Sequence, residues 1–404
     1  MKQEYLLSTG AGRLKNVRPS LIRTILDRAA ALRAEGKKVI PFSAGEPDFN
    51  TPSDIKEAAI RAITNNETHY GSNRGYPPLR NILKEYILRE TGMEYDPASE
   101  IVVTSSAAEA LNNVIFSFVD EGDEVIVITP AFVSYKNLVN MCGGIFVPVP
   151  MKADGEKGFR VDIEAVEAAV SERTKMLVLN SPSNPTGAVF SREDLERICS
   201  MAVEHNFLIL SDEIYSRLVY DGAEFHSVAS FPGMKDHSII VSGFSKTFAM
   251  TGWRIGYLAS DKSLVDHIMR THQYSTTCTP TFIQVGLADA MESPRTRKDV
   301  EEMIAAFAAR RKLIMELLDD IPGLSYVRPY GAFYIMVDVS GLGISSMDFS
   351  MKLLEEKYVA TVPAVGLDDN TGKYVRFSYA TSEENIREGL GRVKEVVSEL
   401  QKTP

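Results

Sequence analysis

The chain has 404 residues, of which 44% are hydrophobic and 24% charged, as in an ordinary soluble globular protein of roughly two or three domains. Its net charge of −10 argues against nucleic acid as a partner, because such binding needs lysines and arginines that neutralise phosphates. No stretch approaches the ~20 apolar residues that cross a bilayer, and the start shows no signal peptide, so we expect a cytoplasmic protein without a membrane partner. The three cysteines have no metal-type spacing, and no metal site is expected.

The hydrophobic pattern predicts helices first and strands afterwards. Apolar residues at helical spacing predict a helix over 20–36, and prolines mark the starts of two more at 52–65 and 77–91. From residue 101 the pattern changes to short apolar runs, typical of buried strands. These runs are Ile101–Thr104, Val125–Ile128, Ile145–Val149, Met176–Asn180, Phe207–Ser211, Ser238–Ser242 and Ile255–Ala259. The helices predicted between them cover 107–119, 132–142, 162–171 and 191–205.

This alternation predicts an α/β fold with a mostly parallel sheet in an α/β/α sandwich. After about residue 290 the pattern changes to α+β. It predicts helices at 295–319, 347–357 and 383–400, with strands at Phe333–Val337, Val359–Val362 and Tyr374–Ser378. We therefore expect a large domain over 45–290, a smaller α+β domain over 291–404, and an N-terminal segment, 1–44, that packs with the smaller domain.

Polar or aromatic residues follow several predicted strands, at the sheet edge where α/β proteins bind ligands. Ser106 precedes Glu109 by three residues, the spacing of a capping box. The helix start with Ala107 and Ala108 is therefore either an ordinary capped end or an anion site. Phe132 is either a core aromatic or a platform for a planar ring.

Two further strand ends carry polar side chains. Asn184 lies in a proline-rich turn, where it either shapes the turn alone or donates a hydrogen bond to a ligand oxygen. Asp212 ends a buried strand, where a carboxylate is costly unless it is paired. It is either a helix cap or the partner of a cation such as a protonated pyridine nitrogen. Tyr215 can reach the same ring.

Lys246 stands among small residues in the segment 242–256. Glycines there let a ligand approach the backbone, and such a setting suits a lysine that holds an aldehyde cofactor as a Schiff base. Arg254, and with it the loop 105–108, can hold a phosphate. An aldehyde, a ring nitrogen, a phenolic oxygen and a phosphate together describe pyridoxal 5′-phosphate.

With these segments in this order, the chain resembles the fold-type I pyridoxal-phosphate aminotransferases of class I/II, close to the aspartate aminotransferase-like branch. The resemblance runs from about Arg18 to Lys394. Its markers are Gly45-Glu46-Pro47-Asp48-Phe49, Tyr70 with Gly75, Asn180–Gly187, Ser211–Tyr215, Gly243–Gly256, Gly331-Ala332-Phe333-Tyr334 and Val375-Arg376-Phe377-Ser378-Tyr379.

The resemblance implies roles for individual residues. Lys246 would bind the cofactor and move the proton between the substrate α-carbon and the cofactor. Arg376 would pair with the substrate α-carboxylate close to the backbone of Gly45, and Phe132 would stack on the ring. Tyr70 would reach the phosphate of the neighbouring subunit, which implies a homodimer with shared active sites.

The chain also departs from the family pattern. Its phosphate loop reads Ser105-Ser106-Ala107, where relatives often have a glycine. Gly243 replaces a serine found three residues before the lysine in many relatives, and Ser245 can take its place. Because of these departures, the sequence does not decide which serine contacts the phosphate.

Other departures concern the substrate side chain. Ala108 stands where some aspartate-using relatives have a lysine, and Ile22 replaces a small polar residue. Arg23 is a nearby cation that either compensates or lies on the surface. The loop 363–370 also differs. These positions favour neutral or hydrophobic donors over aspartate.

The sequence thus predicts an aminotransferase that moves an α-amino group from aspartate or a neutral or hydrophobic amino acid to a 2-oxo acid, with 2-oxoglutarate as the expected acceptor. The reaction would be ping-pong covalent catalysis. Two alternatives stay open. One is a β- or γ-lyase with the same fold and cofactor. The other is a non-catalytic ligand sensor, although the residues before Gly45 offer little room for a DNA-binding module.

Overall fold

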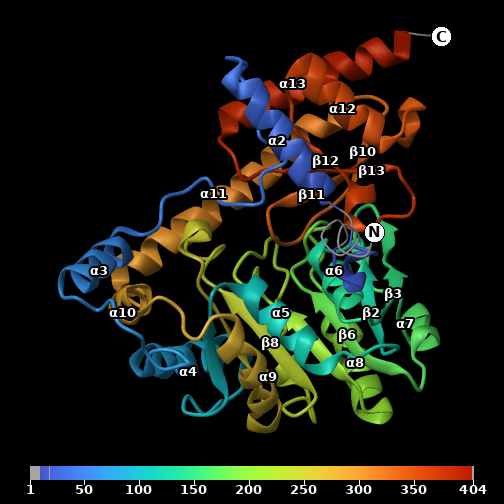
Figure 1. Cartoon of the computed structure of the whole chain (residues 1–404). Coiled ribbons are helices and arrows are strands. Elements are labelled where there is room, and N and C mark those ends of the chain that lie inside the picture. The colour runs from blue at the N-terminus through green and yellow to red at the C-terminus, as the bar shows by residue number, and fades with distance from the viewer. Residues whose placement is uncertain (1–9, 18, 403–404) are drawn as a thin grey trace, which may run out of the picture.

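The structure is a computed structural model that describes residues 10–17 and 19–402. Two sheets with helices around them make up most of it (Figure 1). The first five residues, where no signal peptide is expected, and Arg18, where the resemblance begins, lie outside the described residues.

Every helix and strand predicted from the sequence is present, with ends shifted by three residues at most. The helices are α2 (Leu21–Ala34), α3 (Ser53–Thr64), α4 (Pro77–Thr91), α5 (Ala107–Phe118), α6 (Ser134–Met141), α7 (Ile163–Ala169), α8 (Arg192–His205), α9 (Lys262–Ser275), α10 (Thr281–Ala290), α11 (Pro294–Asp319), α12 (Ser346–Lys357) and α13 (Glu383–Lys402). The strands are β1 (Ile101–Thr104), β2 (Glu124–Thr129), β3 (Ile145–Pro150), β4 (Lys152–Asp154), β5 (Gly158–Arg160), β6 (Thr174–Asn180), β7 (Leu208–Asp212), β8 (Ser238–Gly243), β9 (Gly256–Ala259), β10 (Ser325–Val327), β11 (Tyr334–Asp338), β12 (Val362–Pro363) and β13 (Tyr374–Ser378).

The large sheet has seven strands in the order β1-β9-β8-β7-β6-β2-β3. The strands from β3 to β8 in this order are parallel, whereas β9 is antiparallel to both β8 and β1. Because two antiparallel pairings restore the direction, β1 runs the same way as β8. All strands except β9 therefore end at the same edge, and β9 begins there. The predicted mostly parallel sheet is confirmed.

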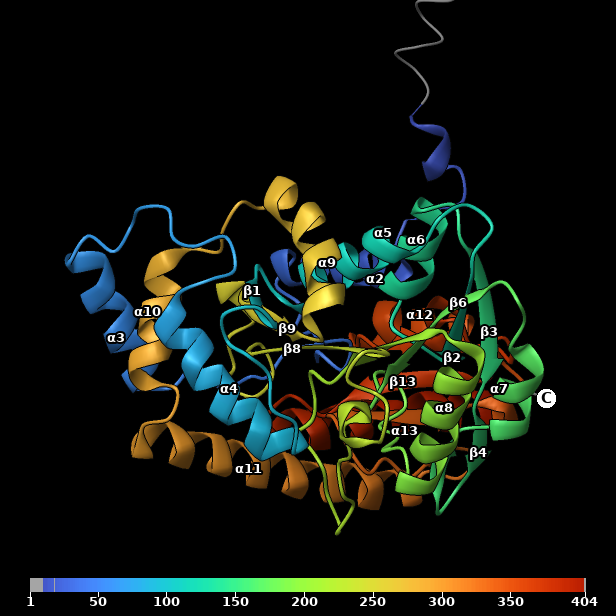
Figure 2. The ribbon, with the colours of Figure 1, turned by 90° about the horizontal axis from the view of Figure 1, so that it is seen from below.

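Helices cover both faces of this sheet. In β2, Val125 and Val127 pack into one cluster with α5, α6 and α9, whereas Ile126 and Ile128 pack into another with α7 and α8. Alternate side chains of a strand point to opposite faces, so these two clusters are the two sides of a sandwich. Figure 2 shows α5, α6 and α9 above the strands and α7 and α8 on the other side.

The small sheet is antiparallel, in the order β10-β11-β13-β12. Its apolar face packs with α11 and α13. Helix α2 buries Ile25, Ala29 and Leu32 in a separate cluster with Leu354 of α12 and Ala360. The N-terminal helix thus lies beside the C-terminal part of the chain (Figure 1).

The sequence analysis missed α9, α10, β4, β5 and β10. Helix α10 packs against both α3 and α4, so it is apolar around most of its circumference and lacks an amphipathic period. Helix α9 buries Val265, Ile268 and His272, and the polar histidine interrupts the apolar spacing by which a helix is recognised in the sequence. The three strands have three residues each, too short for an alternating pattern.

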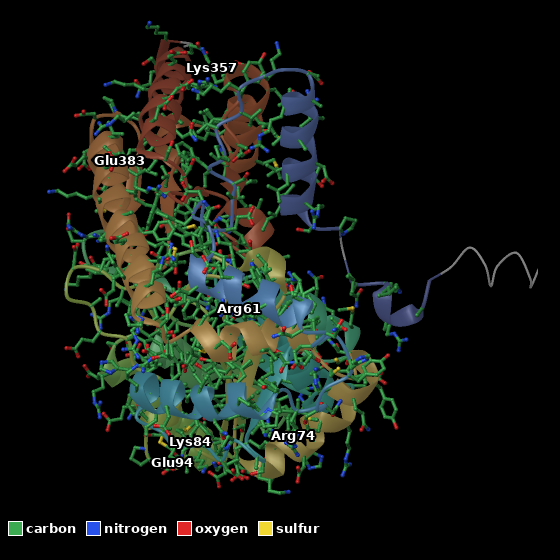
Figure 3. The ribbon with its side chains drawn as sticks, turned by 90° about the vertical axis from the view of Figure 1, so that its left-hand side faces the viewer. Arg61, Arg74, Lys84, Glu94, Lys357 and Glu383 are labelled. Atoms are coloured by element: carbon green, nitrogen blue, oxygen red, sulfur yellow. The ribbon has the colours of Figure 1, made fainter. Side chains whose placement is uncertain are left out.

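Charged side chains are spread over the surface (Figure 3), and many are paired, as Lys84 of α4 is with Glu94 at 2.8 Å. Within the described ranges, no helix is both long and apolar enough to span a bilayer. The described residues also contain no cluster of three or more His, Cys, Asp or Glu side chains suited to a metal ion.

Candidate active site

A cavity of about 320 Å³ opens at the edge where the strands of the large sheet end. Of the residues predicted for the site, all except Tyr70 line it. They are Gly45, Ser106, Ala107, Ala108, Phe132, Asn184, Asp212, Tyr215, Ser245, Lys246, Arg254 and Arg376. The sheet direction explains this meeting, because the segments after β1, β2, β6, β7 and β8 and the segment before β9 reach the same edge.

Lys246 lies three residues beyond β8, and its Nζ donates to the carbonyl oxygen of Gly45 at 2.6 Å. Burial lowers the pKa of Lys246 to about 8, although Glu46 acts in the opposite direction. A lysine with such a pKa is partly neutral near physiological pH. It can therefore act as a nucleophile or accept a proton, which an ordinary surface lysine does poorly.

Asp212 ends β7 and is held by two donors. Tyr135 Oη donates to its Oδ2 at 2.7 Å, and the amide of Ile214 donates to its Oδ1 at 3.2 Å. Burial raises the pKa of Asp212 to about 6 despite these donors. A cationic ligand group beside the carboxylate would favour its charged form. Asp212 is thus a desolvated acid suited to a protonated ring nitrogen.

The start of α5 lines another part of the same cavity. Ser106 adopts φ +86°, in the left-handed region that favours glycine, which accounts for the glycine that relatives often carry in this loop. The predicted capping box is wrong, because the Ser106 side chain caps no amide and Glu109 accepts instead from the amide of Ser105 at 2.6 Å. The first-turn amides beside Ala107 and Ala108 are therefore not capped by Ser106 and suit an anion.

Arg254, two residues before β9, lines the same cavity, with its Nη1 donating to the Thr251 carbonyl at 2.8 Å. The backbone comes very close here, since a Cβ on Gly256 would lie 2.5 Å from the amide nitrogen of Ala107. Gly256 thus allows β9 to begin directly against the phosphate loop. A cation and open amides face the same part of the cavity.

Arg376 of β13 is 2% exposed and lines the cavity. Its Nη1 donates to Asn184 Oδ1 at 2.9 Å, its Nη2 donates to the Ser43 carbonyl at 3.0 Å, and its guanidinium carbon lies over the ring of Tyr334, 4.5 Å from the ring centroid. Its Nε is buried and has no hydrogen-bond partner. A buried donor without a partner is costly, so Arg376 is suited to bind a carboxylate from a ligand.

These groups fit pyridoxal 5′-phosphate. Lys246 offers an amine for its aldehyde, Asp212 an acid for its ring nitrogen, and Arg254 with the α5 amides a site for its phosphate. Asn184 and Tyr215 also line the cavity, but Asn184 Oδ1 already accepts from Arg376, and Tyr215 Oη bonds Tyr334 Oη at 2.9 Å.

The sequence analysis missed several contacts of the site, among them Tyr135, Tyr334 and the carbonyl of Ser43. Tyr135 comes three residues after Phe132, and helical spacing places the two near each other, with ring centroids 5.7 Å apart. Tyr334 stands inside a family marker, but nothing local shows that it meets Tyr215. No local pattern marks the Ser43 carbonyl.

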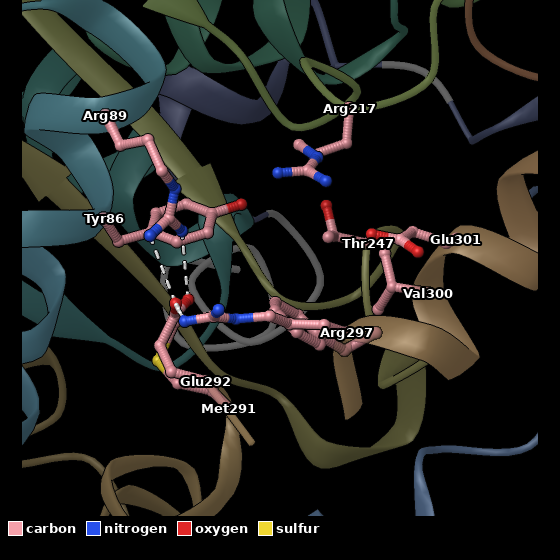
Figure 4. A pocket seen from close by; sticks show the side chains of 10 residues that line it. Tyr86, Arg89, Arg217, Thr247, Met291, Glu292, Arg297, Val300 and Glu301 are labelled. Atoms are coloured by element: carbon pink, nitrogen blue, oxygen red, sulfur yellow. Dashed lines mark hydrogen bonds and ion pairs between the residues drawn. The ribbon is translucent and has the colours of Figure 1, made fainter. Parts of the chain in front are cut away.

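Another cavity, lined by Thr247 among others, lies between α4 and α11 (Figure 4). It contains three arginines, but Arg89 and Arg297 both bind Glu292, and Arg217 binds Glu90 at 2.9 Å. Its cations are therefore already paired with carboxylates. It lacks the acid and amine that the first cavity brings together.

The fold and the first cavity together define an enzyme built to hold an aldehyde cofactor with a phosphate. The family "Aminotransferase class I and II" matches residues 37–393, and the chain belongs to this family. The enzyme is therefore a transaminase, and its cofactor is pyridoxal 5′-phosphate.

Individual relatives agree. The chain is 42% identical to an aspartate aminotransferase of Pyrococcus abyssi over 97% of its own length and 99% of that relative. It is 40% identical to aromatic-amino-acid aminotransferase 2 of Thermococcus litoralis, over 96% and 98%. The solved structure of an aromatic aminotransferase from Pyrococcus horikoshii OT3 superposes with a TM-score of 0.87 at 40% identity, covering 93% of this chain and 99% of that one. These names favour transamination over the lyase and sensor alternatives.

Proposed function

We propose that the enzyme transfers the α-amino group of an amino acid with an apolar side chain to a 2-oxo acid, with 2-oxoglutarate as the expected acceptor. The observation that carries the donor class is the set of apolar side chains that line the cavity. Ile22 and Leu26 of α2 and Leu111 of α5 line it. Ala108 adds no charge there, and Arg23 is exposed outside the lining. An apolar side chain gains from such a surface.

In this proposal, each cationic side chain that lines the cavity has a role other than binding a charged substrate side chain. Arg376 binds the α-carboxylate and so fixes the orientation of the substrate. Arg254 faces the phosphate end. Lys246 remains to hold and return the α-proton at its Nζ. A distal carboxylate, whether of aspartate as donor or of 2-oxoglutarate as acceptor, then needs a cation from outside the described residues of this cavity, such as one from a second subunit, whereas an apolar side chain needs none.

The bound cofactor supplies a ring that withdraws electrons from the substrate α-carbon and makes its proton removable. Asp212 keeps a negative charge beside the ring nitrogen, while Tyr135 holds the carboxylate in place. Phe132 provides an aromatic face, and Asn184 and Tyr215 face the phenolic oxygen. Ser245 and Ser106 contact the cofactor phosphate. We also propose that the chain divides into an N-terminal segment (1–44), a large domain (45–290) and a small domain (291–404).

The donor class can be tested at Ala108. We expect the wild-type enzyme to have a higher kcat/KM for phenylalanine and leucine than for aspartate. The substitution Ala108→Lys should raise kcat/KM for aspartate by about 10-fold and lower it for leucine, because it places a cation beside an apolar wall. The measurement is single-turnover loss of the bound cofactor's absorbance with each amino acid.

Ala108→Met is the matched control, since it adds similar length without charge and should not favour aspartate. If wild-type enzyme instead prefers aspartate over leucine, the apolar donor class is wrong while the transaminase assignment stands.

We further infer that two copies of the chain share their active sites. Tyr70 is 89% exposed and Tyr274 is 88% exposed, and Ile60 and Ile63 of α3 are also exposed. Large apolar groups gathered on a surface typically mark an interface. Tyr70 lies outside the cavity of its own subunit, which supports a role in the site of a second one.

Mixing two inactive variants tests the shared site. Subunits with Lys246→Ala and subunits with Tyr70→Ala should form mixed dimers in which one site keeps both residues. We expect about a quarter of wild-type activity after random exchange. Mixing Lys246→Ala with Asp212→Ala is the control and should restore nothing, because both residues line the cavity of one chain. Lack of recovery in the first mixture, with mixed dimers present by mass spectrometry, would contradict the shared site.

A further inference from the structure

A histidine outside the cavity lies fully buried between two oxygen atoms. His272 of α9 has no exposed surface. Its Nδ1 lies 2.8 Å from Glu109 Oε1, and its Nε2 lies 2.8 Å from the carbonyl oxygen of Asn73. Asn113 Nδ2 donates to the same Glu109 oxygen at 2.6 Å and is 3.4 Å from Nδ1. Neither the cavity lining nor the family markers include this histidine.

Both oxygen neighbours of the ring are hydrogen-bond acceptors. A backbone carbonyl only accepts hydrogen bonds, and so does an ionised carboxylate. Burial alone would raise the pKa of Glu109, but His272, the Ser105 amide and Asn113 outweigh it and hold that pKa below its usual value. His272 and Glu109 thus form a largely buried hydrogen-bonded pair.

Glu109 connects His272 to the phosphate loop, because its second carboxylate oxygen contacts that loop. Its Oε2 accepts from the amide of Ser105 at 2.6 Å. The next residue, Ser106, is held at a positive φ that a residue with a side chain rarely adopts. Thr104 Oγ1 donates to the Ser106 carbonyl at 2.9 Å, which completes the restraint. The loop needs such support because serine, unlike glycine, is strained in this conformation.

We propose that His272 is a positioning residue for the cofactor phosphate: paired with Glu109, it holds the loop Thr104–Ser106 so that the amides at the start of α5 face the cavity. This rests on the proposed role of those amides. At the other end, Asn73 Nδ2 bonds the carbonyl of Thr277. The histidine therefore ties the phosphate loop to the segment after α3 and to the segment after α9.

The test compares pyridoxal 5′-phosphate with pyridoxal, which lacks the phosphate, as ligands of the cofactor-free full chain. The ratio of the two dissociation constants isolates the phosphate contribution. We expect His272→Gln and Glu109→Gln each to reduce this ratio by about 10-fold or more, since the first removes the imidazole that holds Glu109 and the second removes the negative charge that the Ser105 amide contacts. The double variant should lose little beyond either single one. A general loss of stability would weaken both ligands alike and leave the ratio unchanged.

His267→Gln is the matched control, because His267 is exposed on the same helix. It should leave the ratio at the wild-type value. An unchanged ratio in both His272→Gln and Glu109→Gln, with a clear wild-type preference for the phosphorylated ligand, overturns the role of His272. Absence of that preference in the wild-type chain would instead overturn the proposed phosphate site itself, so the two failures are distinguishable.

Discussion

Replacing Lys246 with alanine is expected to reduce transamination by more than about 10⁴-fold while the fold stays intact. The amine lies at the cavity edge of β8, and its pKa of about 8 lets it hold or release a proton near neutral pH. Alanine removes both the group that would anchor the aldehyde and the base for the α-proton. The measurement is steady-state formation of the 2-oxo acid, together with the thermal unfolding temperature.

Lys394→Ala is the matched control, since Lys394 is exposed on α13 far from the cavity. It should leave both the rate and the unfolding temperature unchanged. Lys246→Arg is informative as well, because arginine keeps a positive charge but cannot lose its proton at working pH. It should be as inactive as alanine. Turnover of Lys246→Ala at the parental rate would show that another residue carries the chemistry.

Replacing Arg376 with lysine should lower kcat/KM for amino acids by about 100-fold, and alanine should lower it further, by about 10³-fold. The guanidinium is buried, is held by Asn184 and Ser43, and has one donor without a partner. Lysine keeps the charge but loses the forked geometry that fits a carboxylate. Cofactor affinity should stay near the wild-type value, because Arg376 is not among the residues proposed to hold the cofactor.

An amino acid amide separates this role from a structural one. It lacks the α-carboxylate, so its kcat/KM should differ little between wild type and Arg376→Lys. Arg387→Lys, at an exposed position of α13, serves as the matched control. If the variant at 376 loses activity equally with the amino acid and its amide, then Arg376 acts on the fold and not on the carboxylate.

Much of the fold follows from local sequence patterns. Buried parallel strands are continuous apolar runs, and each ends where polar residues begin, so β1, β2, β6, β7 and β8 could be located with their ends. Polar residues at or just beyond those ends line the cavity, which explains why Asn184, Asp212 and Lys246 could be singled out from the sequence. Helix α10 and the three-residue strands were missed because contacts with distant segments, and not local periodicity, determine them.

The pair Asp212-Glu213 shows where local patterns stop. Both carboxylates are buried, and burial raises the pKa of Asp212 to about 6 and that of Glu213 to about 7. Only Asp212 lines the cavity, whereas Glu213 accepts from Ser211 Oγ at 2.9 Å and Ser227 Oγ at 2.7 Å. Adjacent residues at a strand end point to opposite sides, and only the sheet decides which side holds the ligand.

The sequence by itself determined the positions of the strands along the chain, the acid, amine and arginine near their ends, and hence the cofactor chemistry, because burial and chemical type are properties of single residues and short runs. Tertiary structure alone decided what completes the site. Tyr334 meets Tyr215 across 119 residues, and Ile22 and Leu26 close the cavity from the N-terminal helix. Such contacts depend on how separate sheets and helices pack, and no local pattern contains that information.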